Sequence, residues 1–307
     1  MGAVYLAERV DGTYTQKVAL KVIKDGIDST EILNRFFNER QILASLQHDN
    51  IAHLIDGGST SDGRPFLAME YIEGVPITEY VWKADVGLED RLKLFIEICS
   101  AVSFAHKSLV IHRDLKPSNI LVNKDGVPKL LDFGIAKLIP TEPAEAVTVT
   151  LHFVFTPEYA SPEQVRGEKL TTATDIYSLG VILYELLAAR VPFQGRSPSD
   201  TMYLVRFQDP VSPRLLQPGI PLDLGPICLK CLEKSPERRY ATAAPMAGYL
   251  PRGWSGQPVP ARPWGVLGSG RSASARRATR SRPRGVKMRG RRVQSCSLTG
   301  TTLDSSA

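Results

Sequence analysis

The stretch IHRDLKPSN, residues 111–119, crowds polar and charged side chains directly after an apolar run. The side chains concerned are those of His112, Arg113, Asp114, Lys116 and Asn119. Burying ionised groups is costly unless partners or a metal compensate. We therefore expect this stretch to line a cleft in which bound ions and neighbouring residues balance its charges.

A β-hairpin is predicted immediately after this stretch. The short apolar runs ILV and KLL are separated by NKDGVP, whose residues are typical of a hairpin turn. A hairpin returns the chain on itself, so Asn119 and Asp132, just outside its two strands, should end close together. An amide oxygen beside a carboxylate makes a hard-oxygen site suited to Mg²⁺. With Asp114 and Lys116 beside it, the sequence predicts a site for triphosphate chemistry.

Residues 1–73 predict strands with one helix. The runs VYLAERV and KVALKVI predict one hairpin, and IAHLIDGGSTSDGRPFLAMEYIEG predicts two more strands around a turn. Between them, TEILNRFFNERQILASLQ has helical periodicity, with Phe36, Glu39, Leu43 and Leu46 on one face. That face is apolar except for Glu39, which therefore needs a cation.

After residue 74 the pattern changes to helices. LEDRLKLFIEICSAVSFAHKS, LDLGPICLKCLEK and ATAAPMAGYL predict helices, and DIYSLGVILYELLAAR predicts one that is apolar nearly all round and central to the core. The fold class expected is α+β, with a small β-rich lobe (residues 1–73) and a larger helical lobe (residues 74–250). Residues 251–307 are a basic Arg/Ser/Gly-rich tail, expected to be disordered.

The net charge of +6 is unevenly distributed. Residues 251–307 contain 12 basic residues and one acidic residue, a net charge of +11, which leaves −5 for residues 1–250. No uniformly basic nucleic-acid-binding domain is indicated, and binding of the tail to nucleic acid or anionic lipid is a side hypothesis. No stretch approaches the ~20 apolar residues that cross a bilayer, and no signal-peptide pattern opens the chain, so a cytoplasmic location is expected.

The four cysteines are few and scattered, which favours a reducing compartment over a disulfide framework. Cys228 and Cys231 form a C-x-x-C pattern, but the surrounding sequence has helical spacing. Because no second pair or histidine cluster accompanies them, zinc or redox chemistry is disfavoured.

HRDLKPSN, followed by DFG and then SPE, resembles the signature set of eukaryotic-like protein kinases. The bacterial serine/threonine (Hanks-type) branch is the closest match, on the strength of TPEYASPEQ, TDIYSLGVILYELL and CLEKSPERRY. The similarity covers roughly residues 1–250. It implies a two-lobed kinase fold and transfer of the ATP γ-phosphoryl group to protein serine and threonine hydroxyls, by positioning and electrostatic stabilisation.

The resemblance implies roles for the charged residues around the opening stretch. Asp114 matches the base that accepts the proton of the substrate hydroxyl, and Lys116 the lysine that steadies the transferring phosphoryl group. Asn119 and Asp132 match the residues that hold Mg²⁺. Asp175 matches the aspartate that braces the catalytic loop from the central helix.

The resemblance also implies a nucleotide site. Lys21, in VALK, matches the strand lysine that pairs with the α- and β-phosphates, and Glu39 matches the helix glutamate that holds this lysine in place. Ala19 and Leu121 are implied to enclose the adenine, and Glu70 and Ile72 to hydrogen-bond it through their backbone. Met69 is implied to border the pocket behind the adenine. Gly2 lies in the phosphate loop and Val4 just after it, and both are implied to contact ATP.

A substrate platform is implied by the later motifs. Glu163 matches the glutamate of A-P-E and is expected to pair with Arg239. Thr156 fits the threonine that contacts the catalytic loop in serine/threonine-specific members. Thr148 and Thr150 are candidates for activating phosphorylation.

The pattern departs from the family at the N-terminus. The chain opens MGAVYLAERV, where relatives usually have a first strand and a G-x-G-x-x-G loop over the phosphates, and only Gly2, the last glycine, is kept. We expect either a truncation within the glycine-rich loop, with weaker ATP binding, or a start placed too late at an internal methionine. Phe155 in place of glycine and Ser161 in place of the alanine of A-P-E are smaller departures.

Three functions follow as hypotheses. The first is a protein serine/threonine kinase that uses ATP and Mg²⁺, acts on proteins, binds no specific nucleic acid, and is a monomer or weak homodimer. The second is a catalytically impaired, pseudokinase-like binding scaffold, because the glycine-rich loop is incomplete. A small-molecule kinase of similar fold is disfavoured, because TPEYASPEQ resembles a platform for an extended peptide.

Overall fold

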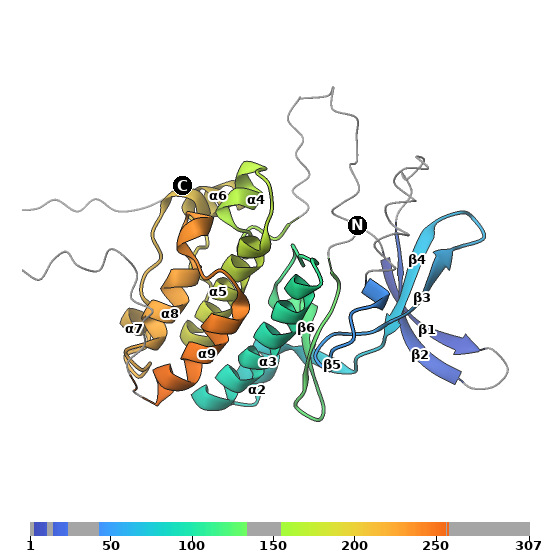
Figure 1. Ribbon diagram of the computed structural model, residues 1–307, viewed down its shortest axis with the longest axis horizontal. Coiled ribbons are helices and arrows are strands. Elements are labelled where there is room, and N and C mark those ends of the chain that lie inside the picture. The colour runs from blue at the N-terminus through green and yellow to red at the C-terminus, as the bar shows by residue number, and fades with distance from the viewer. Residues whose placement is uncertain (1–2, 11–14, 24–42, 134–154, 256, 258–307) are drawn as a thin grey trace, which may run out of the picture. The chain divides into compact units, whose positions relative to one another are not determined.

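The computed structural model describes residues 3–10, 15–23, 43–133, 155–255 and 257, all within one compact unit, Met1–Val266. Its architecture is α+β, with a small antiparallel sheet formed by the N-terminal part and a helical part that follows it (Figure 1). This confirms the predicted fold class.

The N-terminal part forms a four-stranded antiparallel sheet. In order across the sheet, the strands are β1 (Ala3–Val10), β2 (Thr15–Val22), β4 (Pro65–Glu70) and β3 (Leu54–Ser59). The predicted pairings are confirmed, since β1 pairs with β2 and β3 pairs with β4. The helix predicted between these pairs lies mostly outside the described residues.

A second, three-stranded sheet carries the hairpin predicted after the opening stretch. Its strands are β5 (Gly74–Pro76), β6 (Ile120–Asn123) and β7 (Pro128–Leu130). The turn is closed by the side chain of Asn123, whose Oδ1 accepts hydrogen bonds from the N–H groups of Asp125 and Val127. Gly126 supplies the left-handed φ of 77° that this turn requires. The hairpin is therefore specified by its own turn residues.

The helical part begins at α2 and ends at α9. Its helices are α2 (Ile77–Lys83), α3 (Leu88–Lys107), α4 (Pro162–Arg166), α5 (Thr172–Ala188), α6 (Pro198–Phe207), α7 (Pro213–Leu216), α8 (Leu224–Cys231) and α9 (Ala243–Trp254), with 3₁₀ turns at Pro117–Asn119 and Pro236–Arg238. The predictions of α3, α5, α8 and α9 are confirmed. Among the described residues, no helix combines the length and the apolar character that a membrane span requires.

Helix α5 lies in the middle of the core, as its sequence predicts. Almost all of its side chains are buried, and it packs against α3, α7 and α8. Gly180 allows the closest approach, because a Cβ there would lie 2.4 Å from Cβ of Cys231 in α8. Cys228 and Cys231 are thus packed inside the core, where burial raises the pKa of both thiols. This disfavours the thiolate that zinc binding or redox chemistry needs.

The segment after the predicted N-terminal helix is tied to β7. Leu130 N–H donates to Asn50 O at 2.8 Å, and Ala52 N–H donates to Leu130 O at 3.0 Å. The side chain of Asn50 also donates to Pro128 O at 2.9 Å. These bonds join the segment just before β3 to the hairpin strand that leads to Asp132.

Helix α3 ends in a Schellman motif with leucine at the position that favours glycine. Leu109 N–H donates to His106 O at 3.0 Å, and Val110 N–H donates to Ala105 O at 2.9 Å. Leu109 has a φ of 60° and is 92% exposed. The left-handed conformation is strained for a leucine, and the exposed side chain gains little from packing.

Leu109→Gly is therefore expected to raise the free energy of unfolding by about 0.5–1 kcal/mol, after allowing for the entropy that glycine adds to the unfolded chain. Urea unfolding followed by circular dichroism measures this change. Leu222→Gly is the control, because Leu222 is also exposed but has no positive φ. It should lower stability, and an equal gain at both positions would contradict the explanation from backbone strain.

Candidate active site

Asp175, in the first turn of α5, anchors the backbone of the HRD stretch. Its carboxylate is 1% exposed, and it accepts hydrogen bonds from His112 N at 2.8 Å and from Arg113 N at 2.9 Å. His106 Nε2 lies 2.8 Å from the same carboxylate. Arg113 has a left-handed φ of 67°. Asp175 therefore braces the loop immediately before Asp114, in the place that the resemblance implies.

His112 supports the loop from the side of the hairpin. Its Nε2 lies 2.8 Å from Leu131 O, and its Nδ1 lies 3.3 Å from Asp114 N. A carbonyl partner on one nitrogen and an N–H partner on the other fix the neutral tautomer with hydrogen on Nε2. Burial lowers the pKa of His112, and its ring packs 4.8 Å from that of Phe133. His112 is thus a supporting core residue.

The loop brings together Asp114, Lys116, Asn119 and Thr156. Lys116 Nζ lies 3.2 Å from Asp114 Oδ2 and 3.4 Å from Thr156 Oγ1. Asn119 Nδ2 donates to Asp114 O at 2.8 Å. A carboxylate, an ammonium group, an amide and a hydroxyl therefore converge on one small region.

Asp132 joins this region from the end of the hairpin. Leu131 N–H donates to Asn119 O at 2.8 Å, so the backbone of the two hairpin ends is in direct contact. Lys21 Nζ lies 3.0 Å from Asp132 Oδ1. Because Asn119 Nδ2 donates its hydrogen bond to Asp114 O, the amide oxygen of Asn119 is the atom that can face an ion. An amide oxygen beside a carboxylate fits a divalent cation such as Mg²⁺.

The register of the first sheet gathers four predicted nucleotide contacts on one face. Lys21 lies opposite Val4 of β1, and Ala19 lies opposite Met69 of β4. Directly opposed residues share a face, and so do residues two apart on one strand. Val4 is 57% exposed on that face. Lys21, Met69 and Asp132 also line one pocket.

The remaining predicted contacts lie in β6, at the end of β4 and in the segment between β4 and β5. Leu121 on β6 is half-buried, whereas its neighbour Ile120 is fully buried in the core, so Leu121 points to the opposite face. The Glu70 carboxylate lies 3.1 Å from Lys129 Nζ, an ion pair between β4 and β7. Ile72 is half-buried two residues after Glu70.

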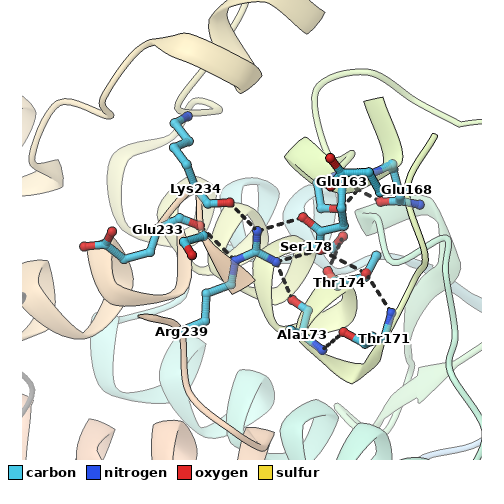
Figure 2. A network of polar contacts seen from close by, with 12 residues as sticks. Glu163, Glu168, Thr171, Ala173, Thr174, Ser178, Glu233, Lys234 and Arg239 are labelled. Atoms are coloured by element: carbon cyan, nitrogen blue, oxygen red, sulfur yellow. Dashed lines mark hydrogen bonds and ion pairs between the residues drawn. The ribbon is translucent and has the colours of Figure 1, made fainter. Parts of the chain in front are cut away.

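The structure brings Glu163 and Arg239 together (Figure 2). Arg239 Nη1 and Nη2 donate to the two Glu163 carboxylate oxygens at 2.7 and 2.8 Å, and the side chains are 0% and 3% exposed. The other Arg239 donors reach the carbonyl oxygens of Ala173, Glu233 and Lys234. Burial raises the pKa of Glu163, but the hydrogen bonds and charge of Arg239 outweigh this and hold the pKa below its ordinary value. The pair joins α4 to the segment after the 3₁₀ turn Pro236–Arg238, and the bond from Arg239 to Ala173 O extends the connection to α5.

Four predicted site residues, Gly2, Glu39, Thr148 and Thr150, lie outside the described residues, and their roles stay predictions. One residue that the sequence analysis did not assign contacts the loop: Gln164 Nε2 donates to Arg113 O at 2.9 Å. Its signal in the sequence is the S-x-x-Q pattern of a helix capping box.

Comparison with known proteins agrees with this geometry. Residues 1–247 match the protein kinase domain family. The chain is 38% identical to the serine/threonine-protein kinase PknB of Mycobacterium leprae (strain TN) over 263 residues, which is 84% of the chain. Over the same share, the chain is 36% identical to PknB of Mycobacterium tuberculosis (strain ATCC 25177 / H37Ra). Serine/threonine-protein kinase PrkC of Bacillus subtilis (strain 168) is 36% identical over 248 residues, 80% of the chain and 37% of the relative.

The chain therefore belongs to the protein kinase domain family. Its relatives group it with the bacterial Hanks-type serine/threonine protein kinases, as the HRDLKPSN, DFG and SPE motifs predict. It spans 42% of the length of the PknB relatives.

Proposed function

We propose that this protein is an ATP-dependent serine/threonine protein kinase whose kinase domain occupies residues 1–250, in two lobes at 1–73 and 74–250. The observation that carries the proposal is the convergence of Asp114, Lys116, Thr156 and Asn119. Lys116 lies within hydrogen-bonding distance of both Asp114 and Thr156, and Asn119 donates to Asp114. The relatives named above are serine/threonine-protein kinases, and none of those names supports the binding-scaffold alternative.

In the proposed reaction, Asp114 accepts the proton of a substrate hydroxyl as its oxygen bonds to the γ-phosphorus. The bond between that phosphorus and the β–γ bridging oxygen breaks, and ADP leaves. Lys116, 3.2 Å from Asp114, balances the charge of the transferring group. Asn119 and Asp132 would hold Mg²⁺, whose charge would offset that of the phosphate oxygens.

The nucleotide is proposed to lie against the sheet face that carries Val4, Ala19 and Lys21. The strand register, which places these side chains on one face, and the exposed apolar side chain of Val4 support this position of the nucleotide. Lys21 holds the α- and β-phosphates and, in this structure, contacts Asp132. The proposed partners are protein substrates without specific nucleic acid, in a monomer or weak homodimer, and the use of ATP supports a cytoplasmic location.

Incubation of the chain with γ-labelled ATP, Mg²⁺ and a generic basic protein is expected to produce labelled phosphoserine and phosphothreonine. Lys21→Met should lower kcat/KM about tenfold or more, because it removes a charged hydrogen-bond donor from the phosphates. Excess EDTA should stop transfer by removing the metal. ATP binding measured by calorimetry without any label transfer would contradict the proposal and favour the scaffold.

A further inference from the structure

Helix α4 begins with a reciprocal capping box. Ser161 Oγ accepts a hydrogen bond from Gln164 N at 3.3 Å, and Gln164 Oε1 accepts one from Ser161 N at 2.9 Å. The serine that replaces the alanine of A-P-E thus has a structural partner in Gln164. A capping box needs only the oxygen of the Gln164 amide, which leaves its NH₂ group for a second contact.

That second contact reaches the catalytic loop. Gln164 Nε2 donates to Arg113 O at 2.9 Å, across 51 positions of sequence. The orientation of the amide is determined by its partners, since Ser161 N–H can only donate and Arg113 O can only accept. One side chain therefore joins the start of α4 to the backbone beside the base.

The Arg113 carbonyl belongs to the peptide group that leads into Asp114. The N–H of this peptide group, on Asp114, faces His112 Nδ1 at 3.3 Å, and the N–H of Arg113 is held by Asp175. Arg113 is in the left-handed region, where an arginine needs outside support. Gln164 supplies support at the carbonyl, through the hydrogen bond from its Nε2.

We propose that Gln164 is a positioning residue: its amide NH₂ sets the plane of the Arg113–Asp114 peptide group and so aims the Asp114 carboxylate from the substrate platform. The proposal rests on the proposed kinase function. A residue that served only to cap α4 would instead act through stability alone, because the cap does not involve Nε2.

Gln164→Glu separates the two roles. The glutamate still accepts from Ser161 N, as in the S-x-x-E form of the capping box, but its ionised carboxylate cannot donate to Arg113 O. We expect kcat to fall about tenfold or more, because small displacements of a catalytic group are costly, while KM for ATP changes little and the chain stays folded under the assay conditions. Ser161→Ala is the matched control, since it removes only the cap acceptor, and it should lower the urea midpoint while leaving kcat unchanged.

Two further measurements keep the test decisive. Gln164→Met removes both side-chain bonds without adding charge and should lower kcat by the same factor as Gln164→Glu. Hydrogen–deuterium exchange of residues 112–116 should quicken in both Gln164 variants and not in Ser161→Ala, whether or not the chain is active. Absence of transfer by the unmodified chain would therefore reject only the proposed function. Wild-type kcat or wild-type exchange in the Gln164 variants would overturn the positioning role.

Discussion

Asp114→Asn is expected to lower kcat by about 10²–10⁴-fold, the usual contribution of a general base. The substitution keeps the shape of the side chain but replaces a proton acceptor of suitable basicity with a neutral amide. Lys116 Nζ lies 3.2 Å from Asp114 Oδ2, and Asn119 Nδ2 approaches the same oxygen at 3.3 Å. An amide oxygen can accept both contacts, so the loop should keep its conformation and KM for ATP should change little.

The measurement is steady-state phosphoryl transfer at saturating ATP, with the urea midpoint as a check on folding. Asp125→Asn is the matched control, because it makes the same chemical change at an exposed position in the turn of the neighbouring hairpin. It should retain wild-type activity. If Asp114→Asn kept more than about a tenth of the wild-type kcat, general-base catalysis by this residue would be excluded.

The parts of the fold that sequence predicts well are those whose causes are local. The hairpin from β6 to β7 is specified by its own turn, where Asn123 accepts two backbone hydrogen bonds and Gly126 takes a positive φ. Helix α3 is long enough for its periodicity to be clear, and α5 is recognised as a long segment that is apolar nearly all round. Convergence of Asn119 and Asp132 follows from the hairpin alone, and the backbone contact between Asn119 and Leu131 agrees with it.

Helices α4, α6 and α7 are missed because the apolar residues within each are too few to establish a period. Helices α4, α6 and α7 span between 4 and 10 residues. Each has serine at the N-cap followed by proline at the first helical position, in Ser161-Pro162, Ser197-Pro198 and Ser212-Pro213. A Ser-Pro pair is typical of a turn, but it is also typical of the start of a helix. The N–H groups of the first helical turn have no partner within the helix, so a proline there loses no hydrogen bond.

Long-range partners in the site depend on information that spacing does not carry. Glu163 and Arg239 are separated by 76 positions, and no periodicity connects them. The resemblance to protein kinases supplies this pair. It does not supply the bond from Gln164 to Arg113, which follows from the fold of α4 against the catalytic loop.

Arg239→Ala is expected to lower the free energy of unfolding by about 3–5 kcal/mol, because it leaves the Glu163 carboxylate buried without its cation. Arg239 is fully buried, and its donors reach both carboxylate oxygens and three backbone carbonyls. Thr174 Oγ1, 3.0 Å from Glu163 Oε1, cannot replace a guanidinium group. Urea unfolding followed by tryptophan fluorescence measures the loss.

Arg166→Ala is the matched control for burial. Arg166 also forms a two-bond pair with a glutamate, at 2.7 and 2.8 Å from Glu168, but both side chains are partly exposed. Its loss should cost less than about 1 kcal/mol. Similar losses in the two variants would contradict the argument from desolvation.

The stabilisation by Arg239 should also depend on pH in a defined direction. The folded-state pKa of Glu163 is lowered relative to its unfolded value, since Arg239 outweighs the opposing effect of burial. The contribution is therefore fully present above the ordinary glutamate pKa of about 4.3 and is lost as pH falls through the lower folded value. The difference in unfolding free energy between wild type and Arg239→Ala should shrink as the pH falls. The decrease should begin above the ordinary glutamate pKa, because burial without Arg239 raises the pKa of Glu163 in the variant. A difference that grew on acidification would show that the ionised carboxylate does not provide the stabilisation.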